Sequence, residues 1–144
     1  MNTGNQLSPD FNWVRERAAC SVAEVFKQLQ LDAEKDVETA NEVLGLEGAL
    51  KFRLTSNTPG DIFVVFQEER PNDEVRFGRG SKEIRIKRKT VADLIVALTL
   101  NNEGRCKLRV NGGEELLDQW QVRRMALEGL FFGEAPTPRD MRGI

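Results

Sequence analysis

The chain has 144 residues, of which 40% are hydrophobic and 31% charged, and its formal net charge is −2. This size and composition predict one globular domain over residues 1–144, with loose tails at 1–7 and 134–144 and no membrane-spanning segment. The near balance of charge excludes a surface built wholly for nucleic acid, while a local basic patch is still compatible with it.

Two helices are expected at the start of the chain. The Ser8–Asp10 segment has the character of a helix start, and a short helix should run from there to about Ala19. Ser21 opens a capping box before the strongest helical periodicity in the chain, over residues 22–44. Gly45 is expected to end this long helix, because glycine readily adopts the left-handed conformation found past a helix C-terminus.

After residue 48 the hydrophobic period changes to two, which is typical of strands joined by tight turns. Turns are expected at 57–60, at 71–73 and at Asn111-Gly112, and residues 90–93 are compatible with a short helix. Six or seven strands are predicted, near 50–55, 61–67, 74–77, 84–87, 94–100, 106–110 and 115–117.

The last predicted helix begins after Asp118 and ends at Gly133, with Trp120, Leu127, Leu130 and Phe131 as its apolar set. The fold class expected from this order is α+β: an N-terminal long helix, an antiparallel six- to seven-stranded meander sheet and a C-terminal helix. The predicted core comprises Val22, Val25, Phe26, Leu29, Leu50, Phe52, Ile62, Val64, Phe66, Val96, Leu98, Leu108 and Val110.

Phe63 and Val65 fall opposite this predicted core face. Apolar side chains on the second face of the sheet would favour a curved sheet, a small-ligand pocket or a homodimer interface. Phe63 is also the only candidate on that face for stacking on a base, so single-stranded nucleic acid is a weakly supported partner.

The sequence contains no histidine and no tyrosine. Without histidine there is no Ser-His or Cys-His nucleophilic pair and no imidazole proton shuttle, and no other nucleophile–base constellation is visible. We therefore expect a protein that is not an enzyme and that has no cofactor. Cys20 and Cys106 lack the spacing of a disulfide framework, and no signal peptide is visible, so a reduced, cytoplasmic chain is expected.

Basic residues alternate with the predicted core residues along the strands and should share the outer face of the sheet. Such a face is either solvated, which is common on antiparallel sheets, or a binding surface for an anionic or protein partner. The candidate residues are Lys51, Arg53, Arg76, Arg85, Lys87, Lys107 and Arg109.

Acidic residues crowd the second half of the long helix, where several form like-charge pairs four residues apart. They are either a solvated face or a site for a divalent metal. The candidate ligands are Asp32, Glu34, Asp36, Glu38 and Glu42. The order helix–antiparallel strands–helix with an acidic first helix is similar in outline to the frataxin family, and this resemblance implies iron handling by the acidic ridge.

These features predict a binding or interaction domain with an acidic helix and a basic sheet face. Separated charge of this kind favours an oriented encounter with a charged partner. A divalent-metal-binding protein and a protein with a small-ligand pocket are the alternatives.

Overall fold

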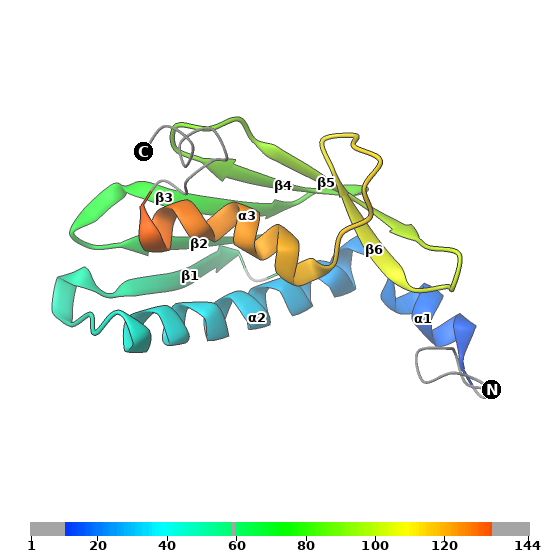
Figure 1. Cartoon of the computed structure of the whole chain (residues 1–144), viewed down its shortest axis with the longest axis horizontal. Coiled ribbons are helices and arrows are strands. Elements are labelled where there is room, and N and C mark those ends of the chain that lie inside the picture. The colour runs from blue at the N-terminus through cyan, green and yellow to red at the C-terminus, as the bar shows by residue number, and fades with distance from the viewer. Residues whose placement is uncertain (1–10, 59, 134–144) are drawn as a thin grey trace, which may run out of the picture.

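The computed structural model describes residues 11–58 and 60–133 and contains one six-stranded sheet with α2 and α3 on the same face (Figure 1). The helices are α1 (Trp13–Ala19), α2 (Val22–Val43) and α3 (Gln119–Phe132), with a 3-10 turn η1 (Gly48–Leu50). The strands are β1 (Phe52–Thr58), β2 (Ile62–Gln67), β3 (Arg70–Arg79), β4 (Glu83–Arg88), β5 (Leu94–Leu100) and β6 (Cys106–Val110). They follow one another in chain order and every neighbouring pair is antiparallel, so the predicted α+β meander is confirmed. None of the described helices is long and apolar enough to cross a bilayer.

Local capping chemistry sets the ends of the two long helices. The Ser21 hydroxyl accepts a hydrogen bond from the Glu24 amide at 3.2 Å, and Gly45 leaves α2 with φ of 64°. Asp118 forms a capping box at the start of α3, and Gly133 ends that helix with φ of 79°. These predicted boundaries are therefore confirmed.

The first helix begins later than predicted. Asn12 is its N-cap and accepts a hydrogen bond from the Arg15 amide at 3.0 Å, so α1 starts at Trp13. The Ser8–Asp10 segment and the two predicted tails lie outside the described residues.

One turn of the strand prediction is wrong, and the structure decides two alternatives that the sequence left open. The β2–β3 hairpin pairs Gln67 with Arg70, so the chain turns at 68–69 and residues 71–73 belong to β3. Residues 90–93 form no helix, and β5 begins directly at Leu94. Six strands form rather than seven, because residues 115–117 contribute only one bridge, between Leu108 and Leu117.

The core lies between the sheet and the helices. The face of β2 that points into the core is the opposite of the predicted one. Phe63 and Val65 are fully buried there, because β2 pairs them with the inward-facing Phe77 and Val75 of β3. The Phe63 ring stacks on Phe77 at 4.4 Å between centroids and contacts Phe26 of α2 at 5.2 Å.

The predicted core residues Ile62, Val64 and Phe66 consequently lie on the outer face, and Leu50 is exposed in η1. Phe26, Leu29, Phe52, Val96 and Leu108 are buried as predicted. Val22, Val25, Leu98 and Val110 are partly buried and pack against the core.

The edge strand β1 is fastened to α2 by one amide side chain. Asn41 accepts a hydrogen bond from the Phe52 amide at 2.8 Å and donates one to the Phe52 carbonyl at 3.0 Å. This side chain reproduces the pairing of a neighbouring strand at the first residue of β1, so it satisfies backbone groups at an otherwise unpaired edge.

Cys20 and Cys106 form a disulfide, so the expectation of two reduced thiols is wrong. Their Cα atoms are 5.4 Å apart, although their sequence separation is 86. The bridge joins the turn between α1 and α2 to the start of β6. Glu16 of α1 also accepts a hydrogen bond from the Cys106 amide at 3.2 Å. No residue of α1 is buried, so the bridge and a few polar contacts hold this helix to the sheet.

Gly129, inside α3, and Gly45, just after α2, together test how much the backbone φ at a glycine matters for stability. A Cβ at either Gly129 or Gly45 would meet no atom within 4 Å, but only Gly45 has a positive φ. We expect Gly129→Ala to raise the free energy of unfolding by about 0.5–1 kcal/mol, because alanine loses less entropy in a helix interior. Gly45→Ala should lower it, since an L residue is strained at that φ. Urea unfolding of both variants checks this, and a stabilising Gly45→Ala would contradict it.

Candidate functional site

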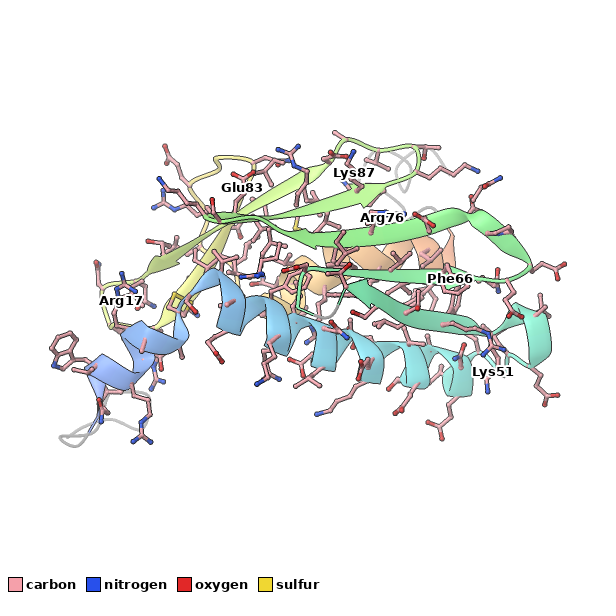
Figure 2. All side chains as sticks on the ribbon, turned by 180° about the vertical axis from the view of Figure 1, so that it is seen from behind. Arg17, Lys51, Phe66, Arg76, Glu83 and Lys87 are labelled. Atoms are coloured by element: carbon pink, nitrogen blue, oxygen red, sulfur yellow. A yellow bond between two sulfur atoms is a disulfide. The ribbon has the colours of Figure 1, made fainter. Side chains whose placement is uncertain are left out.

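The face of the sheet that points away from α2 and α3 is the outer face, and it carries most of the predicted basic residues. Cross-strand partners on this face are Arg53 with Phe66, Arg76 with Lys87 and Ala97 with Arg109. Arg85 lies between Gly78 and Ile95, and Lys107 lies beside Thr99. Lys51 is exposed but precedes β1, so the structure places it outside the strands. Figure 2 views the molecule from this side.

Carboxylates divide the predicted basic surface. Arg53 lies 3.5 Å from Glu68, and Lys107 lies 2.5 Å from Asp118. The outer face is therefore mixed in sign rather than uniformly basic. These pairs are largely solvent-exposed, and exposed ion pairs of this kind contribute little to stability.

The strongest concentration of positive charge is at the centre of the sheet, in Arg76, Arg85 and Lys87, which we call the central basic cluster. Arg76 and Lys87 are direct cross-strand partners, an arrangement that is unfavourable for two like charges. Arg76 is paired with Glu74 at 3.0 Å, and Arg85 is within 4 Å of both Glu83 and Asp93. Lys87 makes no ion pair with any described residue, so its charge is available to a partner.

Apolar side chains lie between these charges. Ile62, Phe66 and Ile95 are partly exposed on the outer face, and Val64 is covered by its neighbours. Because Phe63 belongs to the core, its predicted role as an exposed stacking residue is wrong. The outer face thus combines half-exposed aliphatic surface with charged groups, and Phe66 is the one aromatic side chain that the described strands place on it.

The acidic residues of α2 are divided between two sides of the helix. Asp36 lies 2.5 Å from Arg123 of α3, and Asp32 accepts a hydrogen bond from Gln28 at 3.0 Å. Glu34, Glu38 and Glu42 are exposed. Within residues 11–58 and 60–133, no group of three or more acidic, cysteine or histidine side chains is arranged to hold a metal ion.

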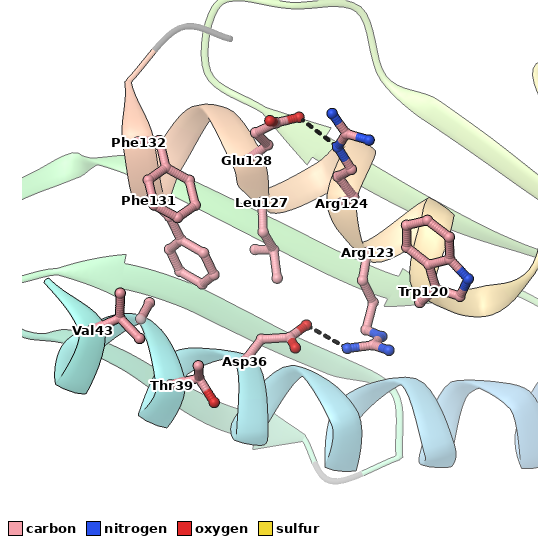
Figure 3. Close-up of a pocket in the computed structure, with 11 residues that line it drawn as sticks. Asp36, Thr39, Val43, Trp120, Arg123, Arg124, Leu127, Glu128, Phe131 and Phe132 are labelled. Carbon is pink, nitrogen blue, oxygen red and sulfur yellow. Dashed lines mark hydrogen bonds and ion pairs between the residues drawn. The ribbon is translucent and has the colours of Figure 1, made fainter.

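A groove of about 470 Å³ separates α2 from α3 (Figure 3), and the sequence analysis did not predict it. Its walls include Val43, Trp120 and Phe132, whose exposed fractions are 71%, 52% and 65%. The Asp36–Arg123 ion pair bridges the two helices across it. The apolar set predicted for this helix includes Trp120. The buried stripe of α3 is instead Val122, Ala126 and Leu127, so Trp120 points outward. A helical projection centred on Val122 and Ala126 is the signal that could have placed it.

Two charged groups with shifted pKa values serve the packing of the hairpins. A hydrogen bond from Lys89, 2.8 Å away, lowers the pKa of the Asp73 carboxyl. Burial lowers the pKa of the Arg88 guanidinium, which donates to the Ala92 carbonyl at 2.7 Å and to the Met125 carbonyl of α3 at 3.3 Å. Arg88 thus fastens α3 to β4 on the core side of the sheet, and neither group lies in the central basic cluster.

The chain matches no protein-family model, no curated protein and no solved structure. None of these comparisons supports the similarity in outline to the frataxin family. The assignment of a function rests on the surfaces described above.

Proposed function

We propose that this domain binds an acidic protein surface on the outer face of its sheet and that it is not an enzyme. The observation that carries the proposal is the direct pairing of Arg76 with Lys87 at the centre of a sheet face that no described helix covers. Two like charges held side by side repel each other, and a partner carboxylate would remove that repulsion.

The composition of the outer face favours a protein over a nucleic acid as the partner. Carboxylates such as Glu74 and Glu83 lie among the cations, and they would repel a continuous phosphate backbone. Aliphatic side chains such as Ile62 and Ile95 flank the central basic cluster and suit the apolar part of a protein interface. A protein surface with carboxylates at its centre and apolar side chains beside them matches both features.

The two alternative functions have different support. Divalent-metal binding by α2 loses support because Asp36 is engaged with Arg123 and because the described residues contain no group of potential ligands. A small ligand would have the α2–α3 groove as its site, since its volume falls in the range of ligand pockets. The groove is open along its length, however, and helix surfaces of that form suit a macromolecule better.

Binding of fluorescent poly-L-glutamate tests the proposal, because this polymer supplies carboxylates without a phosphate backbone. We expect Arg76→Glu with Lys87→Glu to weaken binding at least about tenfold, and added salt to weaken binding by the wild type. The matched control is Lys27→Glu with Lys35→Glu on α2, which changes the net charge equally at exposed positions away from the sheet. Equal losses in both variants would contradict the proposal.

Heparin and single-stranded DNA distinguish the class of partner in the same assay. Tighter binding of poly-L-glutamate than of either polymer, at equal salt, supports an acidic protein. Binding of DNA or heparin without binding of poly-L-glutamate would contradict that choice and favour an anionic polymer.

The cellular location of the protein is a separate question. The composition predicts a cytoplasmic protein, whereas the Cys20–Cys106 disulfide counts against a reducing compartment. We therefore favour an oxidising compartment. Alkylation and mass spectrometry of the protein from its native source would measure the redox state, and two free thiols would contradict this choice.

A further inference from the structure

One side of α3 carries a short pattern that no contact among residues 11–58 and 60–133 explains. Trp120, Arg124, Glu128 and Phe132 follow one another at intervals of four residues, so they form a ridge along the helix. We call these four residues the α3 ridge; all four are among the residues that line the groove, and Figure 3 labels them along α3. Three of the four are exposed, and Glu128 is partly buried.

The ridge leaves large aromatic surface in water. Trp120 and Phe132 stand at its two ends, with Val43 of α2 across the groove from Phe132. Exposed aromatic side chains that border an apolar groove mark an interaction site more often than scattered single ones do. The aromatic ends and the charged centre are also the arrangement that interfaces use, since aromatic residues and arginine dominate their energetics.

The order of residues in the ridge identifies what would cover it. Reading along α3, the ridge is aromatic, cationic, anionic and aromatic, and its midpoint is at Ala126. In a two-fold dimer the same surface is used by both subunits, and a two-fold axis perpendicular to α3 at Ala126 makes the two copies of this helix antiparallel. Residues equally far from the midpoint then face each other: Trp120 faces the partner's Phe132, and Arg124 faces the partner's Glu128. Each contact occurs twice.

The charges of the groove agree with this occupant. Arg123 is engaged with Asp36 at 2.5 Å, so the bridge between the helices is neutral and needs no outside partner. Arg124 and Glu128 form an exposed pair 3.0 Å apart within one helix, and both can exchange this contact for one between subunits. The ridge as a whole has no net charge and is complementary to itself.

From these observations we propose that the α3 ridge is a two-fold interface between two copies of this chain, with the ends of the ridge reaching into the α2–α3 groove of the partner. This goes beyond the proposed function, because it uses the helical side of the sheet and leaves the outer face free. A dimer of this form would present two outer faces to an acidic partner.

Sedimentation equilibrium of the full chain, from about 1 to about 200 µM, tests the proposal because dimer formation depends on protein concentration. We expect the wild type to dimerise in this range. Trp120→Ala with Phe132→Ala should raise the dimer dissociation constant at least about tenfold, since aromatic anchors carry most of the energy of such interfaces. The matched control is Trp13→Ala, an exposed tryptophan on α1 that should have no effect.

A charge exchange tests the register of the two helices. Arg124→Glu alone and Glu128→Arg alone should each weaken self-association at least about tenfold, because each places like charges opposite one another twice. An equimolar mixture of these two variants should form a heterodimer of restored affinity, since one subunit then carries two carboxylates and the other two guanidinium groups. A change that acted only through misfolding would not be rescued by mixing.

Three results would overturn the proposal. The first is a wild-type chain that is monomeric over the whole concentration range. The second is a dimer that the aromatic variant does not weaken, which would place the interface elsewhere. The third is a weakened pair of charge variants that fails to recover when mixed, and circular dichroism of each variant confirms that it is folded. Binding of a small molecule or a foreign helix by a monomeric wild type would likewise assign the groove to another occupant.

Discussion

Replacing both Cys20 and Cys106 by serine is expected to lower the free energy of unfolding by about 4 kcal/mol, because the disulfide closes a loop across a sequence separation of 86 residues. A bridge over so long a loop removes a large part of the conformational freedom of the unfolded chain. The loss is a substantial fraction of the stability of an ordinary domain. Urea unfolding of the double variant and the wild type, both without reductant, measures it.

The double variant also supplies the control for this prediction. A reductant should destabilise the wild type to about the level of the double variant and leave the double variant unchanged. Hydrogen exchange should show the largest local loss of protection in α1, since no residue of that helix is buried. Equal stability of the oxidised wild type and the variant would contradict the prediction.

Phe63→Ala is expected to cost about 3–5 kcal/mol, whereas Phe66→Ala three residues later should cost about 1 kcal/mol. Phe63 is fully buried, with its ring stacked on Phe77 and in contact with Phe26, so its removal leaves a cavity at the centre of the core. Phe66 lies on the outer face opposite Arg53, where water can fill the space that its ring leaves.

The two variants remove the same ring from opposite faces of one strand, so each is the control for the other. Chemical denaturation with a common slope for both variants gives the comparison. A larger cost for Phe66→Ala would mean that the core lies on the other face of β2. Phe63 would then lie on the outer face and not in the core.

The sequence predicts which basic residues share the outer face, but it does not predict which carboxylates lie beside them. Alternation along each strand correctly groups Arg53, Arg76 and Arg85 on one face, because successive side chains point to opposite sides of a sheet. Which carboxylates lie beside them depends on register and on turns. Asp93 approaches Arg85 only because β4 and β5 are paired, and Glu68 approaches Arg53 because β1 and β2 are.

The α2–α3 groove was not predictable, because it is the space between two helices whose nearest ends, Val43 and Gln119, are 76 positions apart in the sequence. Each helix was recognised from its own pattern, yet the angle and distance between them follow from how both pack on the sheet. The exposure of Trp120 depends on the same packing, since Val122, Ala126 and Leu127 occupy the side of α3 that the sheet covers.

The sequence by itself determined the order and type of the elements and the ends of α2 and α3. Ser21, Gly45, Asp118 and Gly133 act on backbone groups within a few residues of themselves, so their effect is visible in a short window. Tertiary structure alone decided the inward face of β2, because residues 62–66 are apolar at every position and only pairing with Val75 and Phe77 distinguishes the two faces. It also decided the Cys20–Cys106 bridge, because the distance between two side chains far apart in the chain is a property of the folded sheet.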